Sequence, residues 1–283
     1  MDAVNAHDGG AWILVGKLPG GLNRGAYELS RADGTRAVLK WHPPAHANRH
    51  LAATSDLLER ARRAGWNSPR WLAFGTLSDG REYVLEELID GARAARFDAD
   101  DLQLVLSANR LQSGLGGDMP RDWSDYLWRV LWVDEGGSGG RLRAQQDTRS
   151  LLERILAAND RDARLPSADL VHGDVGLDNV LIREGRPWFI DAEHAGRGTR
   201  AYDLATMIYP AMVRGEREPS TDVVRTYEHE AMDVVGRSGL VQCVTASMIE
   251  FVAFGLDHWP HDVPRCVARC HAYLDRLAVA RLS

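Results

Sequence analysis

The sequence has few of the features that mark secreted, membrane or nucleic-acid-binding proteins. Only three cysteines occur among 283 residues, at Cys243, Cys266 and Cys270. This small, odd number excludes a disulfide framework, and no second cysteine pair completes a zinc site, so we expect buried free thiols. No apolar run approaches the length that spans a membrane, and residues 1–10 lack the basic and apolar segments of a signal peptide. We therefore expect a cytoplasmic protein that does not enter a membrane.

Negative charge outweighs positive charge. The chain has 34 lysines and arginines against 40 acidic residues, which gives a net charge of −6. Nucleic-acid binding requires a cationic surface, so the composition argues against it. The hydrophobic fraction of 45% and the charged fraction of 26% are ordinary for a globular protein. The length allows one large domain or two lobes around a cleft, in a monomer or a homodimer, and the acidic surface suits a cationic small molecule.

The pattern of apolar residues changes partway along the chain. Strand-like runs cover residues 12–15, 26–29, 37–40, 71–74 and 83–88, and an amphipathic helix is expected from His50 to Ala64. Ile89-Asp90-Gly91 interrupts this pattern as a hinge. Helical patterns then follow at residues 98–113, 122–133, 149–158 and 201–212, with residues 135–140 as a glycine-rich connector. The sequence predicts an α+β protein with a small antiparallel β lobe carrying one helix (residues 1–88) and a larger, mainly helical lobe (residues 89–283).

The most informative segment runs from Val171 to Asp191. Two short apolar runs flank a tight turn that contains Asp174 and Asn179, and a further strand ends at Asp191. Phosphoryl transfer needs an acid that orients or deprotonates a hydroxyl, and an amide and a carboxylate that hold Mg²⁺ against the phosphates. Asp174, Asn179 and Asp191 supply these groups in order. A role in capping the turn is the alternative for Asp174 and Asn179.

These motifs resemble the aminoglycoside phosphotransferase family, which shares the protein-kinase-like bilobal fold with the choline kinases. The resemblance rests on His172-Gly173-Asp174 with Asn179, on Ile190-Asp191 and on Tyr202-Asp203-Leu204-Ala205, and it spans roughly residues 14–212. It implies that Asp174 is the catalytic aspartate, that Asn179 and Asp191 are the metal ligands, that ATP is the co-substrate and that Mg²⁺ is the cofactor. Within these motifs we interpret His172 and Asp203 as structural: His172 braces the loop, and Asp203 ties a helix start to it.

The nucleotide phosphates are expected near Lys40. This residue ends a strand and matches the phosphate-binding lysine of the family, although a surface lysine would fit the same context. The family pairs this lysine with a glutamate on the next helix. Asp56 takes that place here, and Glu59, one turn later, is the alternative partner; either could instead be a solvent-exposed acid of the helix.

Two other segments are expected to contact the nucleotide. Gly20 and Gly21 lie between the first two strands, where glycine allows backbone amides to approach the phosphates; a plain hairpin turn is the alternative. The backbone of Glu86 to Leu88 would hydrogen-bond the adenine. The sequence does not discriminate between ATP and GTP.

Fewer signals mark the acceptor site. Glu193 follows the second acid by two residues and is expected to face the substrate or hold a second cation, although a salt bridge to Arg197 or Arg200 is equally compatible with the sequence. Asp257 lies close to Trp259 in the region where the family closes its substrate pocket. Carboxylates beside aromatic rings favour an amine-bearing substrate.

Together these features predict an ATP-dependent O-phosphotransferase. Its acceptor would be a hydroxyl of an amine-bearing small molecule, in the first place an aminoglycoside or similar cationic antibiotic, and phosphorylation would give resistance. A metabolic kinase of the same fold, acting on choline, a sugar or an amino alcohol, is the main alternative. A pseudokinase-like binding module is disfavoured because Lys40, Asp174, Asn179 and Asp191 are all present.

Overall fold

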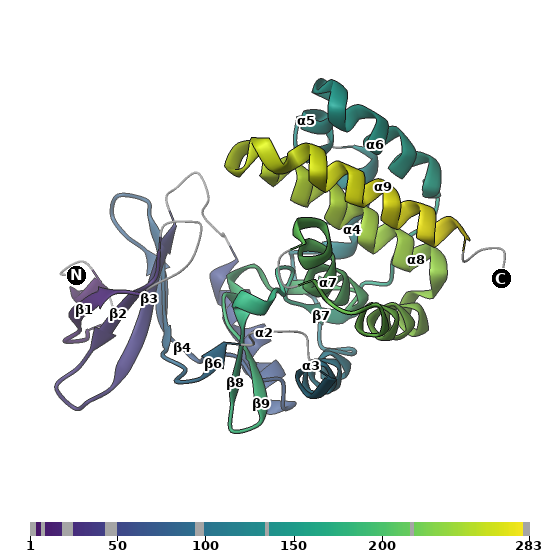
Figure 1. Ribbon diagram of the computed structural model, residues 1–283. Helices are drawn as coiled ribbons and strands as arrows, with labels where there is room; N and C mark the ends of the chain where they lie inside the picture. Colours follow the sequence, from purple (N-terminus) through teal and green to yellow (C-terminus); the bar gives the residue numbers. More distant parts are fainter. Residues whose placement is uncertain are drawn as a thin grey trace.

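The structure, a computed structural model, describes residues 4–6, 9–18, 25–42, 50–93, 99–133, 136–215 and 218–279. Its N-terminal part is an antiparallel sheet in the order β1-β2-β3-β5-β4 (Figure 1). The strands are β1 (Ile13–Lys17), β2 (Tyr27–Ser30), β3 (Arg36–His42), β4 (Trp71–Thr76) and β5 (Glu82–Glu87). Because β3 and β5 are interior strands, side chains on them project from a backbone that is hydrogen-bonded on both sides.

The two faces of this sheet have different surroundings. Leu39 and Leu85 lie opposite each other in β3 and β5 and are buried with Trp12 in a small hydrophobic cluster. Side chains alternate between the faces of a sheet along each strand. Lys40 and Glu86 therefore project from the opposite face, which is the face turned towards the large lobe.

Helix α2 (Leu51–Arg63) packs between this sheet and the large lobe. Its buried residues Leu57, Leu58 and Ala61 recur at helical spacing and belong to the hydrophobic cluster of the large lobe. The helix also contacts β4 and the 3₁₀ segment η3 (Ala192–His194). One turn of α2 thus comes close to the residues that follow the second acidic strand.

The C-terminal lobe is mainly helical (Figure 1). Its helices are α3 (Ala99–Leu111), α4 (Trp123–Trp132), α5 (Ser138–Ala144), α6 (Gln146–Ala158), α7 (Ala201–Arg214), α8 (Thr221–His258) and α9 (Val263–Val279). Helix α8 has a break at Gly236, where φ is 67° and ψ is 177°. It packs against α4, α5, α7 and α9 and forms the centre of the lobe.

Helix α8 is long and apolar. By length and hydropathy alone it could cross a bilayer, but 78% of its most apolar window is buried inside the protein. Burial of this kind is typical of a core helix.

Short strands position the site between the lobes. In the large lobe β7 (Asp169–Val171) pairs with β10 (Gly196–Gly198), and β8 (Val180–Arg183) pairs with β9 (Arg186–Phe189) and with β6 (Ala92–Arg93). The β8–β9 hairpin brings the residues at its two ends together, since the N–H of Ile190 donates to the carbonyl of Asn179 at 3.0 Å. The loop after β7 and the segment after β9 therefore lie side by side.

Most elements expected from the sequence are present, and one expectation is wrong. The glycine-rich segment 135–140 is not only a connector, because α5 begins within it at Ser138. Packing against α8 stabilises this helix despite the weak helix propensity of its glycines. The three cysteines are free and buried, as expected, and burial raises the pKa of the Cys270 thiol to about 12. The division of the chain at Leu88 stays a prediction.

Candidate active site

Asp174 lies in the loop that follows β7. The preceding Gly173 has a φ of +90°, and a Cβ there would lie 2.1 Å from Cζ2 of Trp123, so only glycine fits. The ring of His172 contacts the carbonyl of Ile190 through Nε2 at 2.9 Å, and its Nδ1 accepts the N–H of Asp174 at 3.2 Å. Because Nδ1 is the acceptor, Nε2 carries the proton. His172 therefore braces the loop, and Asp174 is left exposed.

Asp203 holds the same loop from the protein interior. It lies in the first turn of α7 and is 2% exposed. Its Oδ2 accepts the N–H of His172 at 2.8 Å, and its Oδ1 accepts the N–H of Gly173 at 2.9 Å. Burial raises the pKa of Asp203, and these two hydrogen bonds oppose the rise. Asp203 thus ties the start of a helix to the catalytic loop.

Two buried amides continue this network. Nε2 of Gln112 donates to Oδ2 of Asp203 at 2.6 Å and to the carbonyl of Leu170 at 3.1 Å. Nδ2 of Asn109 donates to Oε1 of Gln112 at 2.7 Å and to the carbonyl of Arg200 at 3.0 Å. Both amides are 2% exposed. Their hydrogen bonds fix the orientation of the Asp203 carboxylate.

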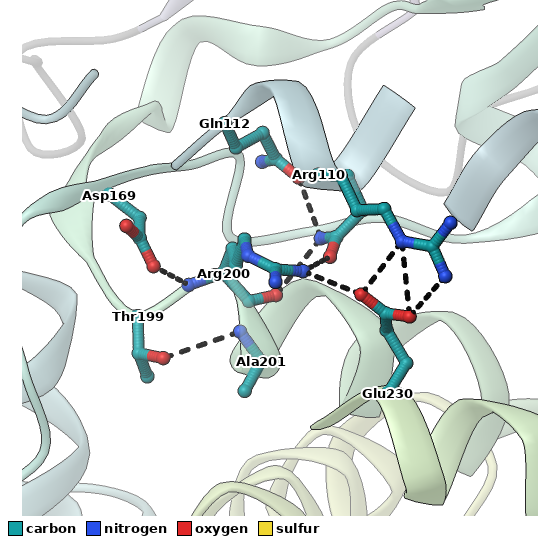
Figure 2. Close-up of polar contacts among 8 residues, drawn as sticks. Arg110, Gln112, Asp169, Thr199, Arg200, Ala201 and Glu230 are labelled. Atoms are coloured by element: carbon teal, nitrogen blue, oxygen red, sulfur yellow. Dashed lines mark hydrogen bonds and ion pairs between the residues drawn. The ribbon is translucent and has the colours of Figure 1, made fainter. Parts of the chain in front are cut away.

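Arg200, the residue before α7, is held through both its backbone and its side chain (Figure 2). The backbone N–H of Arg200 donates to Asp169 at 3.1 Å, and its guanidinium lies 3.1 Å from Glu230 on α8. Glu230 also accepts from Arg110 on α3 at 2.6 Å. Three elements of the large lobe therefore converge on the start of the helix that carries Asp203.

Asn179 and Asp191 lie at the two ends of the β8–β9 hairpin. Nδ2 of Asn179 donates to the backbone oxygen of Asp174 at 2.9 Å and to its Oδ2 at 3.2 Å, which leaves Oδ1 of Asn179 for another ligand. Asp191 has a left-handed backbone with φ 68°, which aspartate tolerates better than most residues, and its side chain is 50% exposed. An amide oxygen and an accessible carboxylate are the hard donors that Mg²⁺ takes while it keeps several waters.

The residues present thus fit a magnesium ion, which Asn179 and Asp191 would hold. Within the described ranges no three histidine, cysteine, aspartate or glutamate side chains gather as a metal site. The remaining ligands of such an ion would have to be waters and substrate phosphates.

Lys40 reaches this site from the small lobe. Its Nζ lies 2.7 Å from Oε1 of Glu86, 2.9 Å from Oδ1 of Asp191 and 3.2 Å from Oε1 of Glu193. Burial by itself would lower the pKa of Lys40, but the three carboxylates raise it well above its usual value. Lys40, whose side chain is 12% exposed, is therefore a largely desolvated cation, and its contact with Asp191 joins the two lobes in one site.

Two of these carboxylates are themselves buried. Glu86 is 3% exposed, and burial raises its pKa to about 7. Glu193 is also 3% exposed; burial would raise its pKa, but Lys40 and His42, whose Nε2 is 3.8 Å away, hold it well below its usual range. The expectation that Glu193 faces the substrate is wrong, because the Lys40 cluster covers its carboxylate.

The alternative partners of Glu193 are corrected as well. Arg197 pairs with Asp122 at 3.0 Å, and Arg200 pairs with Glu230. Both arginines thus hold the framework of the large lobe.

The expected helix partner of Lys40 is a further correction. The buried face of α2 contains Leu51, Thr54 and Leu57, and Asp56 lies on the opposite, exposed face. Glu59 pairs with arginines one turn along the same helix, at 3.3 Å. The phase of the helix therefore turns both acids away from Lys40.

The other expected contacts have different outcomes. Gly20 and Gly21 lie outside the described residues. The backbone of Glu86 is not free for adenine, because this residue lies in an interior strand opposite Val38 and Trp71. Leu88 follows β5, and its contact with the base stays a prediction. Asp257 pairs with Arg141 at 2.5 Å across the surface of α5 and α8, and its role in substrate binding also stays a prediction.

An aromatic wall, formed by Trp123, Tyr126 and Tyr202, stands beside the catalytic loop. The ring centroid of Trp123 lies 5.3 Å from that of Tyr126 and 5.5 Å from that of Tyr202. The indole N–H of Trp123 donates to the carbonyl of His194 at 3.1 Å. Electrostatic interactions link Tyr202 to both Asp174 and Glu250 of α8. The wall therefore borders the loop that carries Asp174.

Sequence reasoning missed the side chain of Glu86, the amides of Asn109 and Gln112, and the aromatic wall. Strand alternation places Glu86 on the face of Lys40 once β3 is paired with β5, but the sequence does not give that pairing. No comparable local signal marks Asn109 or Gln112, since their partners are distant in sequence.

The comparisons with known proteins agree with this geometry. The chain matches the phosphotransferase enzyme family over residues 16–236. This match covers most of the chain, so the protein belongs to that family and is a phosphotransferase.

The individual proteins that resemble this chain share little sequence with it or match only part of it. The EKC/KEOPS complex subunit BUD32 of Yarrowia lipolytica is 33% identical over 89 residues, which are 30% of this chain and 36% of that protein. The chain thus matches about a third of the length of this curated relative. A ternary complex of a thermostable mutant of aminoglycoside phosphotransferase APH(4)-Ia with ADP and hygromycin B has a TM-score of 0.67 at 17% identity, with 96% of each chain covered. Plasmodium vivax ethanolamine kinase has a TM-score of 0.61 at 14% identity, covering 96% of this chain and 83% of that one. The expected protein-kinase-like fold is confirmed.

Proposed function

We propose that this protein is an ATP-dependent kinase that transfers the γ-phosphoryl group to a hydroxyl of an amine-bearing small molecule, in the first place an aminoglycoside or similar cationic antibiotic. One observation carries the proposal. Nζ of Lys40 in the small lobe lies 2.9 Å from Asp191 of the large lobe, in the segment that lies beside Asn179 and Asp174. The groups proposed as phosphate-binding cation, metal-binding oxygens and catalytic acid thus lie together between the lobes.

Each of these residues has a task in the reaction. Asp174 would accept a hydrogen bond from the acceptor hydroxyl and orient it for attack. Although solvent reaches Asp174, the surrounding protein desolvates its carboxylate and raises its pKa, and Asp191 and Asp203 add to the rise. Lys40 would neutralise phosphate charge, while Asn179 and Asp191 would hold Mg²⁺. The ion, when bound, would neutralise charge on the β- and γ-phosphates.

The acceptor class is inferred from the surroundings of Asp174. Within the aromatic wall Tyr126 is 39% exposed and offers a ring to a cation, and Glu250 adds a carboxylate near Tyr202. The solved structure with hygromycin B is consistent with an antibiotic acceptor in a related fold. The fold shared with an ethanolamine kinase keeps a metabolic amino alcohol as the second candidate.

The test is a phosphorylation assay with purified protein, Mg-ATP and a panel of aminoglycosides, peptide antibiotics, macrolides, sugars, choline and ethanolamine. Mass spectrometry would detect the addition of one phosphoryl group to an antibiotic, and Asp174→Ala should fold normally and abolish that product. Phosphorylation of choline, ethanolamine or a sugar alone would make the metabolic alternative correct. Wild-type turnover by Asp174→Ala would refute the assignment of this residue. We also propose a cytoplasmic location, where ATP is available, and cell fractionation tests it.

A further inference from the structure

Glu86 is a buried acid whose place in the sheet brings it to Lys40. In the pairing of β3 with β5, Val38 lies opposite Glu86 and Lys40 lies opposite Val84. Lys40 and Glu86 are therefore diagonal neighbours on one face, a separation that long side chains span. Their charged atoms are 2.7 Å apart. This contact follows from the register of two interior strands and does not depend on how the lobes are placed.

The other carboxylates against Lys40 belong to the large lobe. Asp191 and Glu193 follow β9, and Asp191 is a metal ligand of the proposed reaction, so its carboxylate would be directed to the ion. Glu193 is shared between Lys40 and His42. Glu86 is thus the acid that can stay with Lys40 while the large-lobe carboxylates serve other groups.

Helix α2 supplies no substitute. Asp56 is exposed, and Glu59 pairs with Arg62 and Arg63. The polar residue on the buried face of α2 is Thr54, which is 1% exposed and carries no charge. In the described part of the chain, no acid of α2 lies within ion-pair distance of Lys40.

We propose that Glu86 is the positioning residue for Lys40 and does the work that a helix glutamate does in related kinases. This inference rests on the proposed function, because it assumes that Lys40 binds nucleotide phosphates. Glu86 acts through Lys40 and does not touch the nucleotide itself. The consequence is a phosphate-binding lysine that is oriented by the small sheet alone, so that nucleotide binding does not require an acid on α2.

Isothermal titration calorimetry with MgATP and with adenosine tests the proposal. Glu86→Gln keeps the shape of the side chain and removes its charge. Because Lys40 meets the phosphates and not the nucleoside, the variant should bind MgATP about tenfold more weakly or worse and bind adenosine as wild type does. A merely structural role would weaken both ligands alike, and that result would overturn the proposal. Unchanged or tighter MgATP binding would also overturn it, since Glu86 would then act only as a negative charge near the phosphates.

Matched variants separate Glu86 from the acids of α2. Glu59→Gln makes the same acid-to-amide change on the helix surface and should leave MgATP affinity unchanged. If Asp56→Asn weakens MgATP binding more than Glu86→Gln does, the helix acid is the partner and the proposal is wrong. Wild-type protein that binds no MgATP at all would instead refute the proposed function.

Stability provides a second route in case Glu86→Gln does not fold. Lys40→Met removes the cation that lowers the pKa of Glu86, so the melts are compared well above pH 7, where Glu86 is ionised and a buried charge without its partner destabilises the protein. Adding Glu86→Gln to Lys40→Met should then raise the melting temperature above that of Lys40→Met alone. A double variant that melts no higher than Lys40→Met would show that the two side chains are not coupled.

Discussion

The orientation of the catalytic loop depends on Gln112, and replacing this amide by leucine should be costly. Gln112→Leu removes the hydrogen bonds to Asp203 at 2.6 Å, to the carbonyl of Leu170 at 3.1 Å and from Asn109 at 2.7 Å. A hydrogen bond to a charged group contributes about 1.5–3 kcal/mol and each neutral one about 1 kcal/mol. The expected loss in the free energy of unfolding is therefore about 3–5 kcal/mol, a large part of the stability of an ordinary domain.

Urea unfolding followed by tryptophan fluorescence measures this loss, and a phosphorylation assay well below the melting temperature measures its effect on catalysis. We expect kcat to fall more than the KM for ATP rises, because Asp203 fixes the loop of Asp174 and not the nucleotide. Gln103→Leu is the control, since Gln103 is exposed on α3 and the same change should shift stability by less than about 0.5 kcal/mol. A loss below about 1 kcal/mol for Gln112→Leu would refute the reasoning that these three hydrogen bonds hold the loop.

Three further outcomes follow from the site. Gly173→Ala should lower the free energy of unfolding by at least about 1–3 kcal/mol, because a Cβ at φ +90° is strained and meets Trp123; thermal melts check this, and an unchanged melt would contradict the loop geometry. Asp191→Ala should abolish the increase in melting temperature that Mg-ATP gives to the wild type, and a preserved increase would exclude Asp191 as a metal ligand. Burial raises the pKa of Glu86 from 4.5 to about 7, so the folded state keeps a proton that the unfolded chain has lost. Stability should then fall by up to about 3 kcal/mol as pH rises from about 4.5 to 7. Urea midpoints across this range should show a weaker slope in Glu86→Gln, and identical slopes would contradict this assignment.

The sequence was sufficient for the fold class and for the residues whose chemistry is local. The segment from Val171 to Asp191 contains its own strand, turn and hairpin signals, so its acids and amide could be placed relative to one another without tertiary contacts. His172 could be interpreted as structural within its own loop, whereas the interpretation of Asp203 came from the family resemblance, because its partners are distant in sequence. Hydrogen bonds of His172 to its own loop, and of Asp203 to the backbone of that loop, match this interpretation.

Spacing along the sequence was not enough to identify the partner of Lys40. Asp56 falls at a plausible distance in sequence, but a helix turns by about 100° per residue, and its orientation is decided by the apolar stripe. Leu51, Leu57 and Ala61 form that stripe and bury the side of α2 that faces away from Asp56. The hydrophobic pattern, and not the spacing from Lys40, therefore decides which way Asp56 points. Glu59 forms ion pairs with arginines of the last turn of the same helix.

Strand alternation gives a firmer constraint than helix spacing at this site. Glu86 and Glu87 are neighbours in β5, so their side chains must lie on opposite faces of the sheet. Leu39 and Leu85 face the small hydrophobic cluster, and Lys40 and Glu86 each come one residue later. Once β3 is paired with β5, an acid on the face of Lys40 is unavoidable. What the sequence lacks is the pairing itself, because β4 and the whole of α2 lie between these strands, and the register of such a non-local pair is set by tertiary packing.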